Sequence, residues 1–265
     1  MPGSNLITDR DTAATTAVVR LMHAASAGEP CAPVRDLLGT DIDLAYTVQK
    51  RQTASRIAAG ATVVGHKIGL TSPAVQWQLG VDQPDFGVLF DDMSVSVEFP
   101  AARLVQPKAE AEIAFVLSAD LDDPGLTIAD VRSAVGYATP ALEIVDSRIR
   151  EWDITITDTI ADNASSGLFV LGDEQAELSR FEPRTATMAL EVDGEPASRG
   201  TGADCLGDPL AALLWLARTA HAHGDPLRAG QIVLSGALGP MVAVRPGSTI
   251  HAQISGLGGV TVSCT

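Results

Sequence analysis

Two glutamates inside an apolar segment constrain this chain more than any other feature of its sequence. Residues 108–117 (KAEAEIAFVL) read as a buried strand, with Glu110 and Glu112 two positions apart. Side chains two apart in a strand share a face, so both carboxylates can converge on one cation. A solvated strand face is the ordinary explanation of this spacing, but Ala114 and Val116 leave little of that face polar. Because buried anions need a compensating cation or protonation, we expect a metal site here.

A third carboxylate lies in a second apolar segment, residues 140–146 (PALEIVD). Glu143 is placed inside this segment, and we predict that it joins Glu110 and Glu112 as a metal ligand. Neither segment contains His or Cys, and three carboxylates suit a hard cation that prefers oxygen ligands. The sequence therefore favours Mg²⁺ or Mn²⁺ over Zn²⁺.

Lys67 interrupts another apolar segment, residues 62–70, where Gly65 and Gly69 flank it. An interior lysine is usually an edge residue whose ammonium group reaches solvent. Glycine neighbours, however, allow the backbone and a ligand to approach closely. Beside a bound anion, the ammonium group can polarise an oxygen or deliver a proton. We therefore take Lys67 as a candidate catalytic residue.

Composition limits the class of partner. The formal net charge of -15 argues against binding to nucleic acid or to an anionic membrane surface. No apolar run approaches the roughly 20 residues of a membrane span, and the first residues lack a secretory leader pattern, so we expect a soluble cytoplasmic protein. No Gly-x-Gly-x-x-Gly links a strand to a helix, so a dinucleotide cofactor is not expected. A small molecule is the favoured partner.

The order of helical and strand patterns predicts an α+β fold. An apolar stripe over residues 14–25 and a second helix ending at Gly60 make residues 1–60 a helical N-terminal region. Short strands separated by glycine and proline follow over residues 61–265. We expect these strands to form one β-rich, largely antiparallel catalytic domain.

Three shorter segments carry local predictions. A serine followed by proline opens residues 72–80, which predicts a short helix. Asp208, also followed by proline, predicts a helix that ends at Gly224. Residues 158–167 (DTIADNASSG) are small and polar, and their composition predicts a loop.

Five segments occur in order and together resemble the 2-keto-4-pentenoate hydratases of the fumarylacetoacetate hydrolase superfamily. They are residues 65–72 (GHKIGLTS), 79–87 (LGVDQPDFG), 110–114 (EAEIA), 162–166 (DNASS) and 236–244 (GALGPMVAV). The related 4-oxalocrotonate decarboxylases share the first, third and fourth segments. The second and fifth segments favour the hydratases.

The resemblance implies a mixed β core like that of the fumarylacetoacetate hydrolase C-terminal domain, preceded by a small helical region. It also implies a homo-oligomer and an association with a downstream aldolase. The residues that would hold the divalent cation are Glu110, Glu112 and Glu143. The residues that would face the substrate are Lys67, Asp85 and Ser165 or Ser166.

The resemblance also implies an activity, the hydration of 2-hydroxypenta-2,4-dienoate to 4-hydroxy-2-oxopentanoate in the catabolism of aromatic ring-cleavage products. A divalent cation would polarise the 2-oxygen and stabilise the enolate. We expect Lys67 near the 2-oxygen or as proton donor, and Asp85 as the residue that orients or deprotonates water. These two roles could be exchanged.

Three alternatives stay open. Decarboxylation of a 2-oxo-3-enedioate would need a group for a second carboxylate, yet residues 82–85 offer acids and an amide but no Arg or Lys. Hydrolysis of an acylpyruvate would need a His and carboxylate pair, and His66 is predicted to face away from Lys67. A scaffolding subunit without activity would be expected to have lost the metal ligands, and all three glutamates are present.

Overall fold

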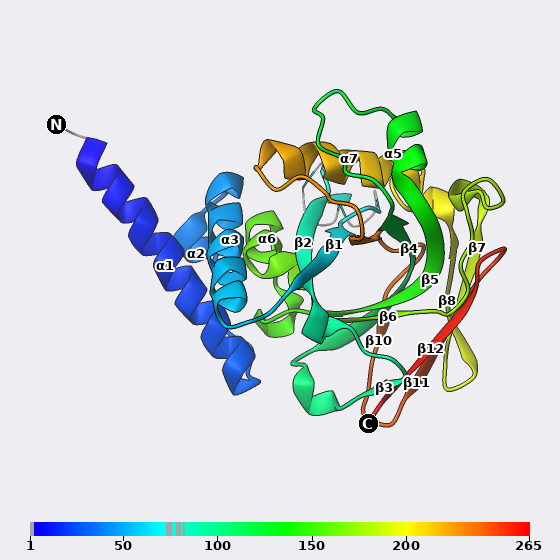
Figure 1. Ribbon diagram of the computed structural model, residues 1–265. Helices are drawn as coiled ribbons and strands as arrows, with labels where there is room; N and C mark the ends of the chain where they lie inside the picture. Colours follow the sequence, from blue (N-terminus) through cyan, green and yellow to red (C-terminus); the bar gives the residue numbers. More distant parts are fainter. Residues whose placement is uncertain (1–2, 73–75, 78–80, 82) are drawn as a thin grey trace.

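Helices make up the first part of the chain and strands most of the remainder (Figure 1). The computed structural model describes residues 3–72, 76, 77, 81 and 83–265. The helices at the start of the chain are α1 (Gly3–Ala27), α2 (Arg35–Leu38) and α3 (Ile42–Ala58). The helix expected over residues 72–80 falls largely outside the described residues.

Helix α1 runs along the outer edge of the molecule, and α3 lies between it and the strands (Figure 1). Ala14, Ala17 and Leu21 of α1 are buried, which agrees with the apolar stripe in the sequence. Asp41 starts α3, because its side chain accepts a hydrogen bond of 2.9 Å from the backbone NH of Leu44. The chain changes from helix to strand after α3, but a separate catalytic domain over residues 61–265 stays a prediction.

The larger sheet has seven strands among the described residues, in the order β2-β1-β9-β4-β5-β6, with β10 paired to β4. Most neighbouring strands are antiparallel, and β1 and β9 run parallel. The strands are β1 (Val63–Gly69), β2 (Asp85–Phe90), β4 (Pro107–Leu117), β5 (Val135–Asp146), β6 (Leu168–Leu171), β9 (Ile232–Leu234) and β10 (Val242–Ala243).

A second sheet of five described strands, in the order β3-β12-β11-β7-β8, contacts β5 and β6 of the first. Its strands are β3 (Glu98–Phe99), β7 (Thr187–Val192), β8 (Glu195–Thr201), β11 (Thr249–Ile254) and β12 (Gly258–Cys264). Asp193 and Gly194, both with positive φ, make the predicted turn between β7 and β8. The mixed, mainly antiparallel α+β fold is the one predicted.

Two helices pack against each other beside the strands, α5 (Ile128–Ala134) and α7 (Pro209–Ala222). Helix α7 begins where predicted, since the Asp208 carboxylate accepts a hydrogen bond of 2.9 Å from the backbone NH of Leu210. Within the described part of the chain, no helix is both long enough and apolar enough to cross a membrane.

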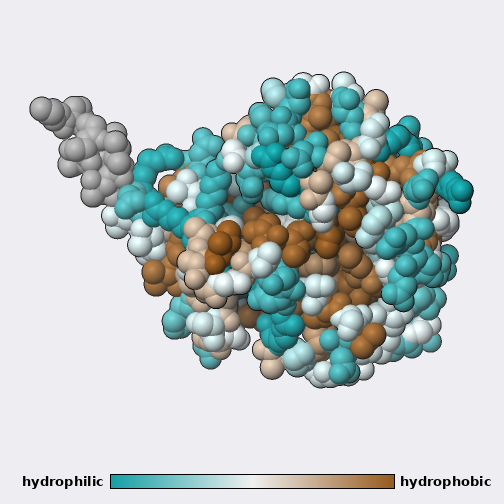
Figure 2. All heavy atoms as spheres, viewed as in Figure 1, coloured by the Kyte–Doolittle hydropathy of each residue, from teal (hydrophilic) through white to brown (hydrophobic). Residues whose placement is uncertain are grey.

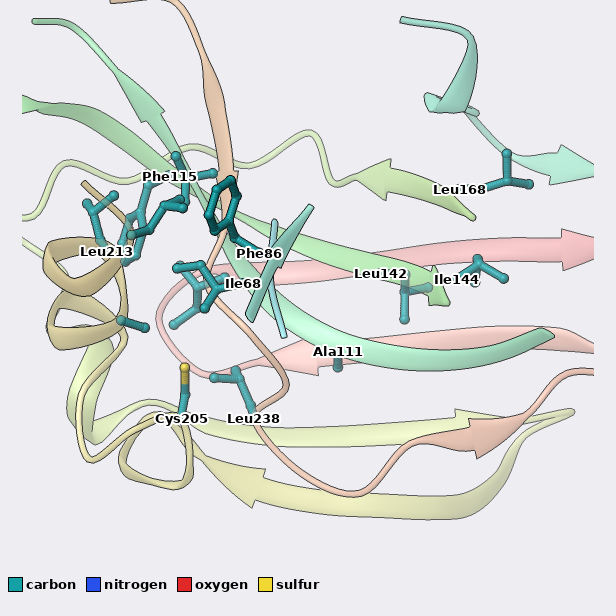
Figure 3. Close-up of a cluster of buried hydrophobic side chains, with 14 of the residues drawn as sticks. Ile68, Phe86, Ala111, Phe115, Leu142, Ile144, Leu168, Cys205, Leu213 and Leu238 are labelled. Carbon is teal, nitrogen blue, oxygen red and sulfur yellow. The ribbon is translucent and has the colours of Figure 1, made fainter. Parts of the chain in front are cut away.

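The two faces of the larger sheet differ in chemistry. One face packs into the main hydrophobic core, where Ile68, Phe86 and Phe115 gather beside Leu213 of α7 (Figure 3). Alternation along each strand turns the neighbouring residues to the opposite face. That opposite face carries the charged residues singled out in the sequence.

The prediction of a loop over residues 158–167 is wrong for its first part. Residues Ile156–Ala161 form helix α6, followed by a short 3-10 turn, Asn163–Ser165. The backbone NH and hydroxyl of Thr155 each donate a hydrogen bond of 2.9 Å to Asp158, which caps the helix. Asp158 is fully buried, and Arg35 compensates its charge by donating to it at 2.8 Å. Tertiary contacts thus stabilise a helix that its polar sequence does not predict.

Candidate active site and metal centre

Three glutamates meet on one face of the larger sheet, and we call them the glutamate cluster: Glu110, Glu112 and Glu143. Glu110 on β4 lies directly opposite Glu143 on β5, and Glu112 follows on the same face of β4. One carboxylate oxygen from each of the three lies within 4.8 Å of the others. Glu112 and Glu143 are fully buried, and Glu110 is half-buried. The strand register brings these residues together as the sequence spacing predicted.

The glutamate cluster is short of hydrogen-bond donors. Glu112 Oε2 accepts a hydrogen bond of 2.8 Å from the backbone NH of Gly236. Among the described residues, Glu112 Oε1 and Glu143 Oε2 have no hydrogen-bond partner, and Glu143 Oε1 has the Lys67 ammonium group as an ion-pair partner. Buried carboxylate oxygens without partners are costly, and a hard cation satisfies them. The donor set therefore fits a divalent cation such as Mg²⁺ or Mn²⁺.

Lys67 lies beside the glutamate cluster, with its Nζ 3.2 Å from Glu143 Oε1. Burial alone would lower the pKa of Lys67, but the neighbouring carboxylates, led by Glu143, raise it above its usual value. The lysine is therefore a buried, charged ammonium group. Lys67 on β1 pairs with Gly87 of β2, where a Cβ would come within 2.4 Å of the carbonyl oxygen of Asn163.

Asp85 lies next to Lys67 on the same sheet face. Gly69 is its partner across the strands, and a Cβ there would come within 2.2 Å of Asp85 Oδ1. Thr159 of α6 donates a hydrogen bond of 2.9 Å to Asp85 Oδ2. Within the described chain, Oδ1 has no hydrogen-bond partner. Burial raises the pKa of Asp85, and the nearby Lys67 charge opposes that rise.

Burial also dominates the electrostatics of the three glutamates. It raises the pKa of Glu110 to about 7, and the neighbouring charge of Glu143 adds to the rise. The pKa values of Glu112 and Glu143 are raised by burial as well. Without a cation, the glutamate cluster therefore holds protons at a pH where ordinary carboxyl groups are ionised.

Ser165 reaches the site from a strained turn. Asn163, Ala164 and Ser165 all have positive φ, at 55°, 51° and 51°. Non-glycine residues rarely adopt this left-handed conformation, and three in a row need support from surrounding contacts. Ser165 Oγ is buried and has no hydrogen-bond partner among the described residues.

Two long-range contacts hold this turn. The side-chain amide of Asn163 accepts a hydrogen bond from the backbone NH of Val88 at 2.8 Å and donates one to its carbonyl at 2.9 Å. Arg148 donates to Asp162 Oδ1 and to the carbonyl of Ser166, both at 2.6 Å. Arg148 thereby joins the two ends of the turn.

A cavity of about 180 Å³ connects these groups. Of the predicted substrate-facing residues, Lys67, Asp85 and Ser165 line it, together with Glu110 of the glutamate cluster. Ser166 does not line this cavity, because its hydroxyl turns back to donate to the carbonyl of Asn163 at 2.7 Å. The structure thus brings Ser165 to the cavity and directs Ser166 away from it.

A larger cavity of about 430 Å³ lies behind the turn, between α1, α3 and the strands. It contains Ser166 but none of the glutamate cluster. Figure 2 shows hydrophobic atoms gathered between the helical part and the strands on the face that it views. Size alone does not make the larger cavity the reactive one, since Lys67, Asp85 and Glu110 all line the smaller.

Sequence reasoning missed three residues of the smaller cavity: Thr159, Lys108 and Trp152. Thr159 lies in the segment predicted as a loop, so its contact with Asp85 had no local signal. Lys108 could have been found from its position two residues before Glu110, on the same face of one strand. Trp152 comes from a turn between β5 and α6 and has no periodic pattern.

Comparison with known proteins agrees with this geometry. Residues 62–264 match the family described as fumarylacetoacetate (FAA) hydrolase C-terminal. The chain is 53% identical over 264 residues to the "TodF product hydratase" of Pseudomonas putida strain F1, covering 97% of this chain and 98% of that protein. It is also 53% identical to a "2-keto-4-pentenoate hydratase" of Paraburkholderia xenovorans, over 91% of this chain and 90% of that one.

A solved structure gives the same answer for the fold. The 4-oxalocrotonate decarboxylase of Pseudomonas putida G7, complexed with magnesium and adipate, superimposes with a TM-score of 0.90 at 33% identity. The alignment covers 95% of this chain and 98% of the decarboxylase. The chain belongs to the fumarylacetoacetate hydrolase family, alongside relatives named 2-keto-4-pentenoate hydratase.

Proposed function

We propose that this protein is a metal-dependent hydro-lyase that converts 2-hydroxypenta-2,4-dienoate to 4-hydroxy-2-oxopentanoate. The observation that carries the proposal is the glutamate cluster next to Lys67 and Asp85 at one cavity of about 180 Å³. This volume suits a small acid, since pockets for drug-sized ligands start at about 300 Å³. The names of the relatives at 53% identity support the same reaction.

The glutamate cluster would hold Mg²⁺ or Mn²⁺, both of which prefer carboxylate oxygens. When bound, the cation supplies Lewis-acid polarisation of the substrate's 2-oxygen and carboxylate. The magnesium in the decarboxylase structure supports a divalent cation in this family.

Lys67 and Asp85 act on different atoms of the substrate. Lys67 is next to the glutamate cluster, so it donates a hydrogen bond to the 2-oxygen. Asp85 Oδ1, which has no hydrogen-bond partner among the described residues, takes the proton of the 2-hydroxyl group and delivers it to C5, which gives 2-oxopent-3-enoate. Asp85 then takes a proton from water as the hydroxyl group adds to C4, and it returns that proton to C3. Thr159 orients Asp85 by donating to its other oxygen.

Ser165 completes the wall around the reacting atoms. Its hydroxyl group is buried and lines the cavity, where it can donate a hydrogen bond to the substrate or to the attacking water. The left-handed turn keeps that hydroxyl group on the cavity side, and Ser166 supports the turn.

Decarboxylation of 2-oxohex-3-enedioate is the second candidate, favoured by the TM-score of 0.90 to a decarboxylase. Hydrolysis of an acylpyruvate is less well supported. His66 Nε2 lies 3.3 Å from Asp225 on the sheet face opposite Lys67, so this pair is not at the cavity. Assembly into a homo-oligomer, association with an aldolase and a cytoplasmic location stay predictions.

The test is parallel turnover of 2-hydroxypenta-2,4-dienoate and 2-oxohex-3-enedioate with Mg²⁺. Loss of dienol absorbance together with formation of 4-hydroxy-2-oxopentanoate reports hydration, and CO₂ release reports decarboxylation. We expect hydration of the first substrate to dominate. Predominant CO₂ release from the second, with no product from the first, would replace the hydratase by the decarboxylase.

A further inference from the structure

Lys108 adds a second ammonium group to the wall of the active-site cavity. The chain contains only three lysines, and two of them, Lys67 and Lys108, line this cavity. Lys108 lies two residues before Glu110 on β4, so both side chains share one face of the strand. The strand therefore places a cation immediately beside the end of the glutamate cluster.

Trp152 holds the Lys108 side chain in place. The Lys108 ammonium group lies 4.2 Å from the centre of the Trp152 ring, a cation–π contact. Trp152 Nε1 in turn donates a hydrogen bond of 3.1 Å to the carbonyl of Gln106, which fixes the ring. Across the part of the chain that the structure describes, no carboxylate forms an ion pair with Lys108. The Trp152 ring thus holds the Lys108 ammonium group at the wall, with Glu110 as the neighbouring carboxylate.

The charges around the cavity indicate what the Lys108 ammonium group can do. The glutamate cluster and Asp85 carry four carboxylates, and Lys67 supplies one positive charge. A divalent cation would still leave one negative charge in excess around the cavity. The chain as a whole, with a formal net charge of -15, also repels anions. Lys108 brings the loaded cavity to formal neutrality, which an anionic substrate needs in order to enter.

We propose that Lys108 is a substrate-binding residue that pairs with the C1 carboxylate of a monoanionic 2-hydroxy or 2-oxo acid. The inference rests on the proposed function for the substrate class. A carboxylate held beside Glu110 meets Lys108, while the hydrocarbon chain extends toward Lys67 and Asp85. A second carboxylate at that far end would face Asp85 and be repelled.

Pyruvate, a non-reacting 2-oxo acid, provides the binding test. Its Kd is measured by isothermal titration calorimetry at saturating Mg²⁺ in the wild type and in Lys108→Met, which retains an apolar stem against Trp152. We expect Lys108→Met to weaken pyruvate binding about tenfold, since a charge-assisted contact is lost. Lys108→Arg should stay within about threefold of wild type because it keeps the charge. Lys108→Gln serves as a second neutral variant if Lys108→Met folds poorly.

Three controls test whether the effect comes from the charge of Lys108. Lys50→Met removes the same charge from the exposed Lys50 on α3, and it should leave pyruvate binding unchanged. Pyruvamide, the uncharged analogue, should bind wild type and Lys108→Met equally. Titration with Mg²⁺ alone should give a Kd for Lys108→Met no weaker than that of wild type, because the change removes a positive charge near the glutamate cluster.

The proposal is overturned if the neutral variants bind pyruvate within twofold of wild type, or if pyruvamide loses as much affinity as pyruvate. It is also overturned if affinity falls only for 2-oxohexanedioate, because Lys108 would then bind a distal carboxylate. With the dienoate, Lys108→Met should raise KM about tenfold and leave kcat within threefold. Pyruvate binding does not require turnover, so absence of hydration in wild type would refute the proposed reaction while leaving the role of Lys108 independently measurable.

Discussion

Glu112 and Glu143 of the glutamate cluster and Asp162, the partner of Arg148, are all buried carboxylates, but of these only Asp162 has hydrogen-bond donors for both oxygens among the described residues. Arg148 donates to Asp162 through Nε at 2.6 Å and through its backbone NH at 2.9 Å, so both carboxylate oxygens have partners. In the glutamate cluster, the Lys67 ammonium group lies 3.2 Å from Glu143 Oε1, but Glu143 Oε2 and Glu112 Oε1 have no hydrogen-bond partner among the described residues. Buried polar groups in stable proteins are nearly always paired. The unpaired site is therefore the one built for a ligand, and the paired site supports it.

The contrast also separates catalytic groups from structural ones. The Arg148–Asp162 pair holds the turn that carries Ser165, but neither residue lines the smaller cavity. Glu110 of the glutamate cluster and Lys67, by contrast, both line that cavity. Substitutions in the glutamate cluster should therefore change activity more than stability, and substitutions in the pair should do the reverse.

The largest effect is expected from Glu112→Gln and Glu110→Gln. Each change removes a charged ligand, so binding of divalent cations should be lost and activity should fall at least about 10³-fold. The fold should be retained, because removing a buried carboxylate also removes its desolvation cost. Calorimetric titration with Mg²⁺ and Mn²⁺ measures the first effect and circular dichroism the second. Unchanged activity of thoroughly chelated wild type would falsify the metal assignment.

Lys67→Met should have the next largest effect. The variant retains an apolar stem but loses the ammonium group, so turnover should fall by on the order of 10² to 10⁴ while the Kd for Mg²⁺ changes little. Lys50→Met is the matched control for loss of one lysine charge, and its kcat should equal that of wild type. A decrease in turnover of less than threefold would assign Lys67 a structural role.

Asp162→Asn tests the paired site. The amide group would place a donor against donors of Arg148, so the free energy of unfolding should fall by about 3 kcal/mol. The control is Asp153→Asn, which breaks the exposed ion pair with Arg35 and should cost less than about 1 kcal/mol. Urea denaturation measures both. An equal loss of unfolding free energy in the two variants would mean that the buried Arg148–Asp162 pair stabilises the protein no more than the exposed Arg35–Asp153 pair.

The smallest effect concerns the pH dependence of the metal-free protein. Burial raises the pKa of Glu110 to about 7 in the folded protein. Its contribution to the free energy of unfolding is therefore fully present below its unfolded pKa near 4.5 and is lost as pH rises through 7. The Tm without metal should therefore fall between pH 5 and pH 8. Mg²⁺ should raise the Tm by several degrees at pH 8 and less at pH 5, since ionised carboxylates bind it. An equal increase in Tm at both pH values would contradict the link between Mg²⁺ binding and ionisation of the glutamates.

Part of the site was readable from the strands alone. A two-residue period places Glu110 and Glu112 on one face, and the same rule separates Lys67 from His66. The helical start and the β-rich remainder followed from apolar spacing and from glycine and proline breaks. These inferences succeed because strand alternation and helix boundaries depend on neighbouring residues in the sequence.

Other parts depended on contacts between distant segments. The polar sequence of helix α6 does not predict a helix, because Arg35, which stabilises it, is 123 residues away from Asp158. The choice between Ser165 and Ser166 rests on a left-handed turn that Arg148 and the Asn163 contact with Val88 support.

The sequence by itself therefore determined the fold class, the family resemblance and the three carboxylates that converge through strand pairing. Only the tertiary structure decided which serine faces the cavity, that Thr159 supports Asp85, and that Lys108 rests on Trp152. The physical reason is how far apart in the sequence the interacting residues lie. A strand's face is set by its own residues, whereas a strained turn and a cavity wall exist only when remote side chains supply the compensating contacts.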